Sequence, residues 1–271
     1  MNEIGLEPLL RRDRAIVAVA LAVIVTLAWI YVLHLAAGMD MGGMDMTGFR
    51  MISTGLEMAM APAQTPWSGA EFVLTFAMWA VMMIGMMTPS AAPMILIYAR
   101  AGRVASAAGS PLAATGWFVA AYLAVWTGFA LAATSAQFAL GRFALLDPAM
   151  ASASNLLGGV LLVGAGLYQW TPLKHGCLSQ CQSPLLFIER HGGFQKNLAG
   201  ALRLGGEHGL YCLGCCWALM AILFVGGVMN VAWIAALSAF ALAEKIIPAG
   251  WRVSWIAGAV LAAAGVRLLL I

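Results

Sequence analysis

Long apolar stretches dominate this chain and restrict the folds open to it. Hydrophobic residues make up 63% of its 271 residues and charged residues 9%, which is too apolar for an ordinary soluble domain. A membrane-spanning helix needs roughly 20 mainly apolar residues. We therefore expect an all-α fold, a polytopic transmembrane helical bundle of about seven spans, with six as the alternative, in a single integral membrane domain (residues 1–271). The candidate spans are residues 15–37, 69–98, 112–134, 152–170, 208–229, 231–247 and 251–270.

The basic residues predict how this bundle is oriented. Lysine and arginine collect on the cytoplasmic side of membrane proteins. Seven spans that begin inside leave only Arg50, Arg142 and Arg267 of the 14 basic residues outside. We expect a multi-pass protein of the bacterial inner (cytoplasmic) membrane, embedded in the lipid bilayer, with a cytoplasmic N-terminus. Because the basic residues are scattered among loops and form no stripe, we expect no nucleic-acid partner.

Cysteine and histidine are confined almost entirely to one part of the chain. All five cysteines and three of the four histidines fall within residues 171–220, whereas residues 35–170 contain neither type. Thiolate and imidazole are ligands that copper and zinc prefer. The pattern indicates a metal site or a thiol-redox site, and the alternative is that the cysteines pack as small hydrophobes. The candidate ligands are Cys177, Cys181, Cys212, Cys215, Cys216, His175 and His208.

The first of these candidates lie in residues 171–207, which we expect to form a cytoplasmic Cys/His loop. If residues 174–182 are helical, Cys177 and Cys181 stand one turn apart on one face, and in a loop conformation His175 can join them. Because the cytoplasm is reducing, we expect free thiols here rather than structural disulfides.

The remaining candidates share one face of the predicted helix at residues 208–229. At about 100° per residue, they fall within about 140° of the helical circumference. The face begins near the cytoplasmic surface and continues into the membrane, where an ionisable group indicates a functional site. Its members are His208, Cys212, Cys215, Cys216 and Met220.

Methionine is concentrated in a second region. Thirteen of the 17 methionines lie within residues 39–94, in a predicted external Met-rich loop at 38–66 and in the span after it. Thioether sulfur selects Cu(I), and several flexible methionines can wrap one ion. We expect the loop to capture copper, and the alternative is that it is an interfacial segment. We expect the methionines of the span to form a sulfur-lined face that binds the ion, and the alternative is that they only pack. The candidate ligands are Met39, Met41, Met44, Met46, Met82, Met83, Met86 and Met87.

Two further features lie near these ligands. Pro89 and Pro93 should kink the methionine-bearing helix, and the freed carbonyls must then be satisfied by neighbouring helices, hydroxyls such as that of Ser90, or water. Glu244 and Lys245 lie at membrane depth. They form either a structural ion pair or a second shell that tunes the ionisation of the cysteines.

Several segments together resemble a known family. They are MMTPSAAP in the second span, TPLKHGCLSQCQSP, HGLYCLGCCWALM, GGVMN at residues 226–230 and the Glu244-Lys245 pair. The chain resembles the bacterial family of predicted metal-binding integral membrane proteins of unknown function over residues 69–247. The double-cysteine block is the most specific part. The resemblance implies a polytopic membrane fold and a metal site at the matching cysteines, but no reaction.

Two functions from different classes fit these observations. The first is a protein that handles Cu(I), with zinc or another soft metal as the alternative ion. Its role would be uptake, transfer or delivery of the ion, and its partner would be a membrane metalloenzyme or a periplasmic metal chaperone. External methionines would collect the ion and the cysteines would receive it, because affinity rises from thioether to thiolate. The second is a membrane thiol-disulfide oxidoreductase. The supply of methionine favours metal transport or a chaperone role over an enzyme.

Overall fold

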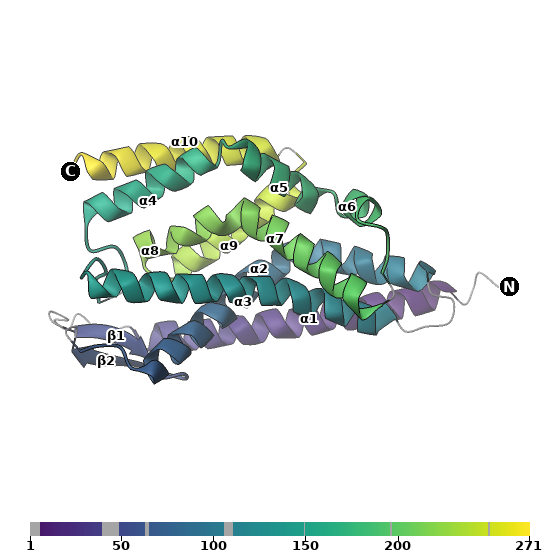
Figure 1. Cartoon of the computed structure of the whole chain (residues 1–271), viewed down its shortest axis with the longest axis horizontal. Coiled ribbons are helices and arrows are strands. Elements are labelled where there is room, and N and C mark those ends of the chain that lie inside the picture. The colour runs from purple at the N-terminus through teal and green to yellow at the C-terminus, as the bar shows by residue number, and fades with distance from the viewer. Residues whose placement is uncertain are drawn as a thin grey trace.

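The computed structural model of the chain is helical almost throughout (Figure 1). It describes residues 6–39, 49–62, 65–105, 111–148, 150–195, 197–248 and 250–271. The helices are α1 (Leu6–Ala37), α2 (Gly69–Ala105), α3 (Pro111–Arg142), α4 (Asn155–Tyr168), α5 (Pro172–Gln182), α6 (Pro184–Arg190), α7 (Leu198–Ala221), α8 (Leu223–Gly226), α9 (Val231–Ile246) and α10 (Gly250–Leu269). The all-α class predicted from the sequence is confirmed.

One small sheet lies within the segment expected to be an external loop. Strands β1 (Phe49–Ser53) and β2 (Met58–Pro62) form an antiparallel hairpin in which Met51 pairs with Met60. Met51 is buried, whereas Met60 is 42% exposed. The hairpin was not predicted from the sequence, because its strands are only five residues long.

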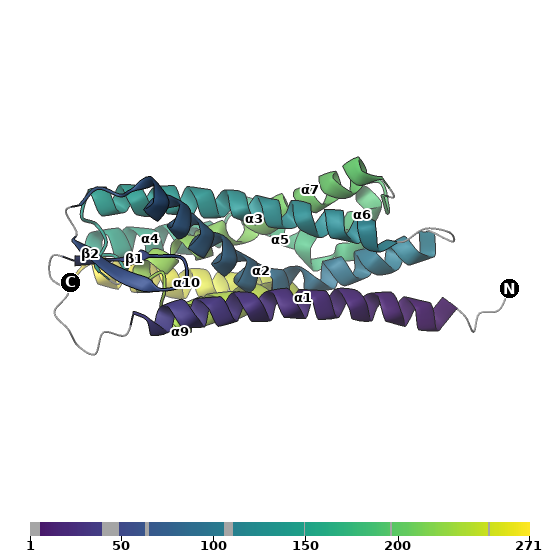
Figure 2. The ribbon, with the colours of Figure 1, turned by 90° about the horizontal axis from the view of Figure 1, so that it is seen from below.

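The long helices run along one axis and divide the molecule into two ends (Figures 1 and 2). We call one the hairpin end, which holds β1, β2, the connection between α3 and α4, and the C-terminus. We call the other the N-terminal end, which holds the starts of α1, α3 and α7, the end of α2, and α6. Each of the longest helices reaches from one end towards the other.

Five helices of the described ranges are long and apolar enough to cross a membrane, within α1, α2, α3, α7–α8 and α10. The α4–α5 pair makes a sixth candidate if its bend of 64° is counted within one span. The predicted span at 231–247 corresponds to α9, whose 16 residues are fewer than the roughly 20 that a bilayer requires. The seven-span count therefore stays a prediction.

The predicted Cys/His loop at 171–207 contains α5, α6 and the start of α7. Thr171 caps α5 by accepting a hydrogen bond from the Lys174 backbone N–H, and Pro172 occupies the first turn, where proline favours a helix. Asn197 caps α7 in the same way. Local capping signals thus extend the helical structure into a segment whose polarity suggested a loop.

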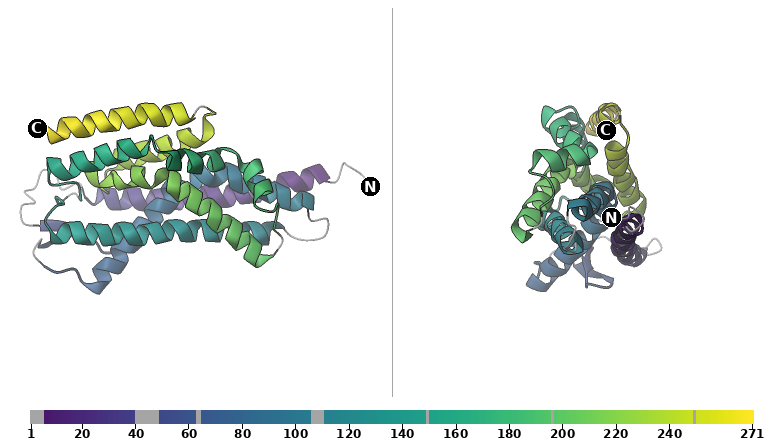
Figure 3. Two further views of the ribbon diagram at one scale, coloured as in Figure 1. Left: turned by 45° about the horizontal axis from the view of Figure 1, so that its top comes forward. Right: turned by 90° about the vertical axis from the view of Figure 1, so that its right-hand side faces the viewer.

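Close packing of α4 on α10 holds the C-terminal half of the bundle together (Figure 3). A β-carbon at Gly166 would lie 2.7 Å from the carbonyl oxygen of Gly258, and one at Gly265 would lie 2.7 Å from the backbone nitrogen of Val163. Only glycine permits this approach of two helix backbones, as small residues do in membrane bundles. Helix α5, which follows α4, bends away from it by 64° and packs on α7.

Candidate metal centre

Four thiols converge where α5 crosses α7. Cys212, Cys215 and Cys216 are buried on α7, and Cys181 of α5 lies close enough to interact electrostatically with Cys212 and Cys215. The Sγ atoms of Cys215 and Cys216 are 3.2 Å apart. All four side chains are buried and all five cysteines of the chain are free thiols. We refer to Cys181, Cys212, Cys215 and Cys216 as the cysteine cluster.

The fifth cysteine lies beside this cluster. Cys177 is half-buried over Gly214, where an added β-carbon would come within 2.6 Å of its Sγ. Gly214 therefore lets α5 approach α7 closely. The helical alternative for residues 174–182 is the one the structure adopts, and it directs Cys181 rather than Cys177 towards the α7 thiols.

Lys245 from α9 completes the surroundings of Cys212. Its Nζ donates hydrogen bonds to the Sγ of Cys212 at 2.9 Å and to the Oγ of Ser90 on α2 at 2.8 Å. The side chain is buried, so the ammonium has little water to compensate its charge. A hydrogen bond from a cation favours the thiolate over the thiol, because it stabilises the negative charge on sulfur.

Glu244, the neighbour of Lys245, has a different partner. Both of its carboxylate oxygens lie 2.8 Å from the Nζ of Lys174 on α5, and the Ser254 hydroxyl of α10 donates to Oε1 at 2.6 Å. The sequence suggested that Glu244 and Lys245 either form an ion pair or surround the thiols and tune their ionisation. Because the two side chains have different partners, the geometry favours the second hypothesis. Lys174 and Lys245 were counted as cytoplasmic charges, whereas the structure buries both.

Tyr122 and His208 form one wall of the site. The hydroxyl of Tyr122 lies 3.2 Å from the Sγ of Cys212 and donates to the carbonyl of Met87 at 3.0 Å. His208 lies four residues before Cys212 and stacks on Tyr122, with a ring separation of 5.8 Å. Its buried Nδ1 has no hydrogen-bond partner in the described part of the chain. Tyr122 could not be singled out from the sequence, because one tyrosine in an apolar helix carries no distinguishing signal.

The predicted methionine face of α2 is buried beside the cysteine cluster. Met82, Met83, Met86 and Met87 are all inaccessible to solvent or nearly so. The carbonyl of Met86 accepts a hydrogen bond from the Ser238 hydroxyl of α9 at 3.0 Å, and that of Met87 accepts one from the Tyr122 hydroxyl of α3 at 3.0 Å. Pro89 and Pro93 lie within α2, and the carbonyls that lose a partner to them, four residues earlier, are those of Gly85 and Pro89, so how the freed carbonyls are satisfied stays a prediction.

The other predicted ligands lie apart from the cluster or cannot be placed. Nε2 of His175 accepts a hydrogen bond from the Trp255 indole of α10 at 3.3 Å. Met39 follows α1 and is half-buried against the core. Met41, Met44 and Met46 lie outside the described residues.

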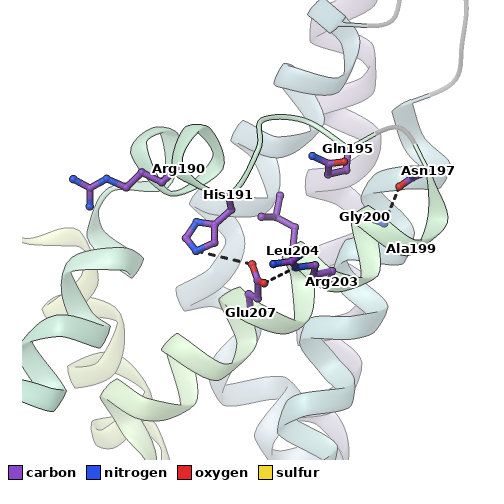
Figure 4. Close-up of a pocket in the computed structure, with 9 residues that line it drawn as sticks. All are labelled: Arg190, His191, Gln195, Asn197, Ala199, Gly200, Arg203, Leu204 and Glu207. Atoms are coloured by element: carbon purple, nitrogen blue, oxygen red, sulfur yellow. Dashed lines mark hydrogen bonds and ion pairs between the residues drawn. The ribbon is translucent and has the colours of Figure 1, made fainter.

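A polar pocket of about 450 Å³ opens at the N-terminal end, between α6 and α7 (Figure 4). His191 and Glu207 face one another there, with Nε2 and Oε2 3.9 Å apart, and Glu207 also pairs with Arg203. The His191 ring stacks on Phe187 at 4.2 Å, and Phe187 contacts His208 at 5.4 Å. A row of rings therefore links the pocket to the helical turn before Cys212. The sequence analysis assigned no role to His191.

The thiols are not arranged as ligands in the present geometry. Within the described ranges, no three His, Cys, Asp or Glu side chains are positioned together to hold a metal ion. Cys215 instead lies 3.1 Å from the Cys212 carbonyl and 3.2 Å from Cys216 Sγ. A soft ion bound by these thiols would have to replace these weak hydrogen bonds.

A protein-family model described as PpoB2, copper chaperone, matches residues 76–268. This range includes the cysteine cluster, Lys245 and the methionine face of α2, and it excludes the predicted Met-rich loop. No curated protein and no solved structure matches the chain.

Proposed function

The chain belongs to the copper chaperone family described as PpoB2, and we propose that it is a membrane protein that binds Cu(I) in its cysteine cluster and passes the ion to a partner. One observation carries the proposal. Four thiols from two helices meet in the buried interior around the ammonium group of Lys245. Thiolate sulfur is the ligand type that selects Cu(I).

Charge favours Cu(I) over zinc bound by all four thiolates in this site. Before metal binds, the charges of the Lys245 ammonium and the Cys212 thiolate sum to zero. When Cu(I) arrives and a second thiol loses its proton, two thiolates, one Cu⁺ and one ammonium again sum to zero. A zinc ion held by all four thiolates would leave a net negative charge beside Lys245, and uncompensated charge is costly in a buried site.

The methionine face of α2 provides a route to the cysteines. Met78, Met82 and Met86 recur every four residues, so neighbouring β-carbons are about 5–6 Å apart, and all three are buried. Thioethers hold Cu(I) without losing a proton and more weakly than thiolates do. An ion therefore moves downhill along α2 towards Cys212.

The orientation follows from charge at the two ends. Arg14, Arg100 and Arg190 lie towards the N-terminal end, which we assign to the cytoplasm of a bacterial inner membrane. The hairpin end then faces outward, as the sequence predicted for residues 38–66. In this orientation the polar pocket of Figure 4 faces the cytoplasm, where His191 and Glu207 are available to a protein that accepts the metal.

A thiol-disulfide oxidoreductase is the second candidate. The 3.2 Å separation of Cys215 and Cys216 sulfurs and the contact between Lys245 and Cys212 favour it, because a cation-activated thiolate attacks disulfides. This function makes no use of the buried methionines of α2.

Elemental analysis and a thiol count on the purified protein distinguish the two functions. The chain is loaded with Cu(I) under anaerobic conditions, freed of excess metal and assayed before and after reduction. Our proposal predicts a single copper ion per chain and five reduced thiols. A copper-free protein with a reducible disulfide would instead establish the oxidoreductase.

A further inference from the structure

A small cavity at the hairpin end is lined by methionines from two distant parts of the chain. Its volume is about 120 Å³, and Met51 of β1 and Met150 of the α3–α4 connection both line it. Both methionines are more than nine-tenths buried. Neither belongs to the methionine face of α2, and Met150 lies well outside the Met-rich region.

The structure holds Met150 in a defined position. Its backbone has a φ of 59°, and Ala144, which lines the same cavity, has a φ of 51°. Residues other than glycine adopt such angles rarely, and such outliers often accompany a functional site. The side-chain amide of Gln137 donates to the Met150 Sδ at 3.2 Å, which orients the thioether. Packing alone does not require this combination.

The surroundings suit a cation with little hydration. Arg50 lines the cavity, but the carboxylate of Glu71 neutralises it in a paired contact. Asp147 adds a carboxylate to the lining, so the local charge is negative. Met60 lies directly opposite Met51 in the hairpin and therefore on the same sheet face, and it is 42% exposed. An ion has a path from an exposed thioether to a buried one.

The cavity is joined to the methionine face of α2. The Gln137 amide that orients Met150 accepts a hydrogen bond from the indole of Trp79 at 2.6 Å. Trp79 is next to Met78, the first residue of the series that leads to the cysteine cluster. The cavity thus lies at the outer end of that series.

We infer that Met51 and Met150 form a thioether site that accepts a soft monovalent cation, Cu(I), at the hairpin end. The inference rests on the proposed function and specifies where the ion first enters the bundle. The ion keeps its oxidation state and exchanges only its ligands, so the step needs no electron or proton. Met51 and Met150 supply the sulfur ligands, and Gln137 positions one of them.

Methyl NMR of the full-length protein tests the site directly. The protein carries ¹³C-methyl methionine, and Ag(I), a redox-inert substitute for Cu(I), is added beyond the amount that fills the cysteine cluster. The methyl signals of Met51 and Met150, assigned through Met51→Leu and Met150→Leu, should shift. The signals of Met94 and Met229, which are also buried, should stay unchanged. Unchanged Met51 and Met150 signals would overturn the inference.

A kinetic experiment separates this site from the cysteine cluster. Cu(I) in a weak acetonitrile complex is mixed with the protein, and the ultraviolet absorption of the copper–thiolate bond is followed. Met51→Leu/Met150→Leu should load about tenfold more slowly, a loss typical of ligand-sphere changes, yet reach the same final absorption. Met229→Leu is the matched control and should load normally. If the double variant loads at the normal rate, the thioether site is contradicted and the proposed function is not. Methyl shifts without any copper–thiolate absorption contradict only the proposed function.

Discussion

Lys174 and Lys245 are both buried lysines near the crossing of α5, α7 and α9, yet their partners differ in kind. Lys174 meets a carboxylate, that of Glu244, with both oxygens at 2.8 Å. Lys245 meets a thiol, that of Cys212, and a hydroxyl, that of Ser90. The Glu244 carboxylate is occupied on both oxygens by Lys174, whereas the sulfur of Cys212 is a ligand type that soft metals prefer. The first pair therefore holds helices together, and the second remains open to a metal ion.

The largest effect should come from breaking the structural pair. Glu244→Gln leaves the Lys174 ammonium buried without a counter-charge, so we expect the free energy of unfolding to fall by about 3–5 kcal/mol. Denaturant unfolding in detergent measures this. The matched variant Lys174→Met/Glu244→Leu removes both charges and should be far more stable than Glu244→Gln. A loss of only about 1 kcal/mol, as for an exposed pair, would refute the assigned role.

Next in size is the contrast between Cys212 and Cys177. Serine is nearly isosteric with cysteine but is a poor ligand for soft metals. Cys212→Ser should lose its Cu(I) at chelator concentrations at which the wild type keeps the ion, because Cys212 interacts with both the other thiols and Lys245. Cys177→Ser should retain its copper. Competition with a chromophoric Cu(I) chelator measures both. Equal copper content in the two variants would remove Cys212 from the site.

Lys245→Met should weaken Cu(I) binding without destabilising the fold. The substitution leaves a neutral Cys212 thiol rather than an unpaired charge, so the free energy of unfolding should change far less than in Glu244→Gln. Loss of the counter-charge should reduce the affinity for Cu(I) by about 10–100-fold, as second-shell changes do, and Lys245→Arg should restore part of it. If Lys245→Met unfolds as readily as Glu244→Gln and still binds copper normally, the two lysines serve the same structural purpose.

The smallest effect should come from Tyr122→Phe. The change removes one hydroxyl that contacts Cys212 and Met87 and retains the ring that stacks on His208. We expect a loss of about 0.5–1.5 kcal/mol in Cu(I) binding, the usual worth of one hydrogen bond, measured with the same chelator. Tyr211→Phe is a matched control, because Tyr211 contacts the rings of Phe187 and His191 rather than the thiols. A loss as large as that of Lys245→Met would indicate that Tyr122 holds the thiolate directly.

The repeating features of this molecule could be read from its sequence. Periodicity located the long helices and placed Cys212, Cys215 and Cys216 on one face of α7, which the structure buries. The helical alternative for residues 174–182 also followed from residue type, because Thr171 and Pro172 favour the start of a helix. In these cases, neighbours in sequence determine the local geometry.

Pairings between distant residues could not be read in this way. Glu244 pairs with Lys174 rather than Lys245 because the bend between α4 and α5 brings α5 over α9. The same bend selects Cys181 over Cys177 for the cysteine cluster. The cavity between Met51 and Met150 depends on a hairpin and a turn with unusual backbone angles. Hydrophobic periodicity contains no information about such contacts.

X-ray absorption spectroscopy of the Cu(I)-loaded protein tests the central claim most directly. The technique reports the ligand atoms around copper without any change to the sequence. Our account predicts a low-coordinate Cu(I) ion surrounded by thiolate sulfur, and a spectrum that changes when Cys212 is replaced by serine and stays the same when Cys177 is replaced. A first shell of nitrogen and oxygen, or a sulfur shell unaffected by Cys212→Ser, would contradict it.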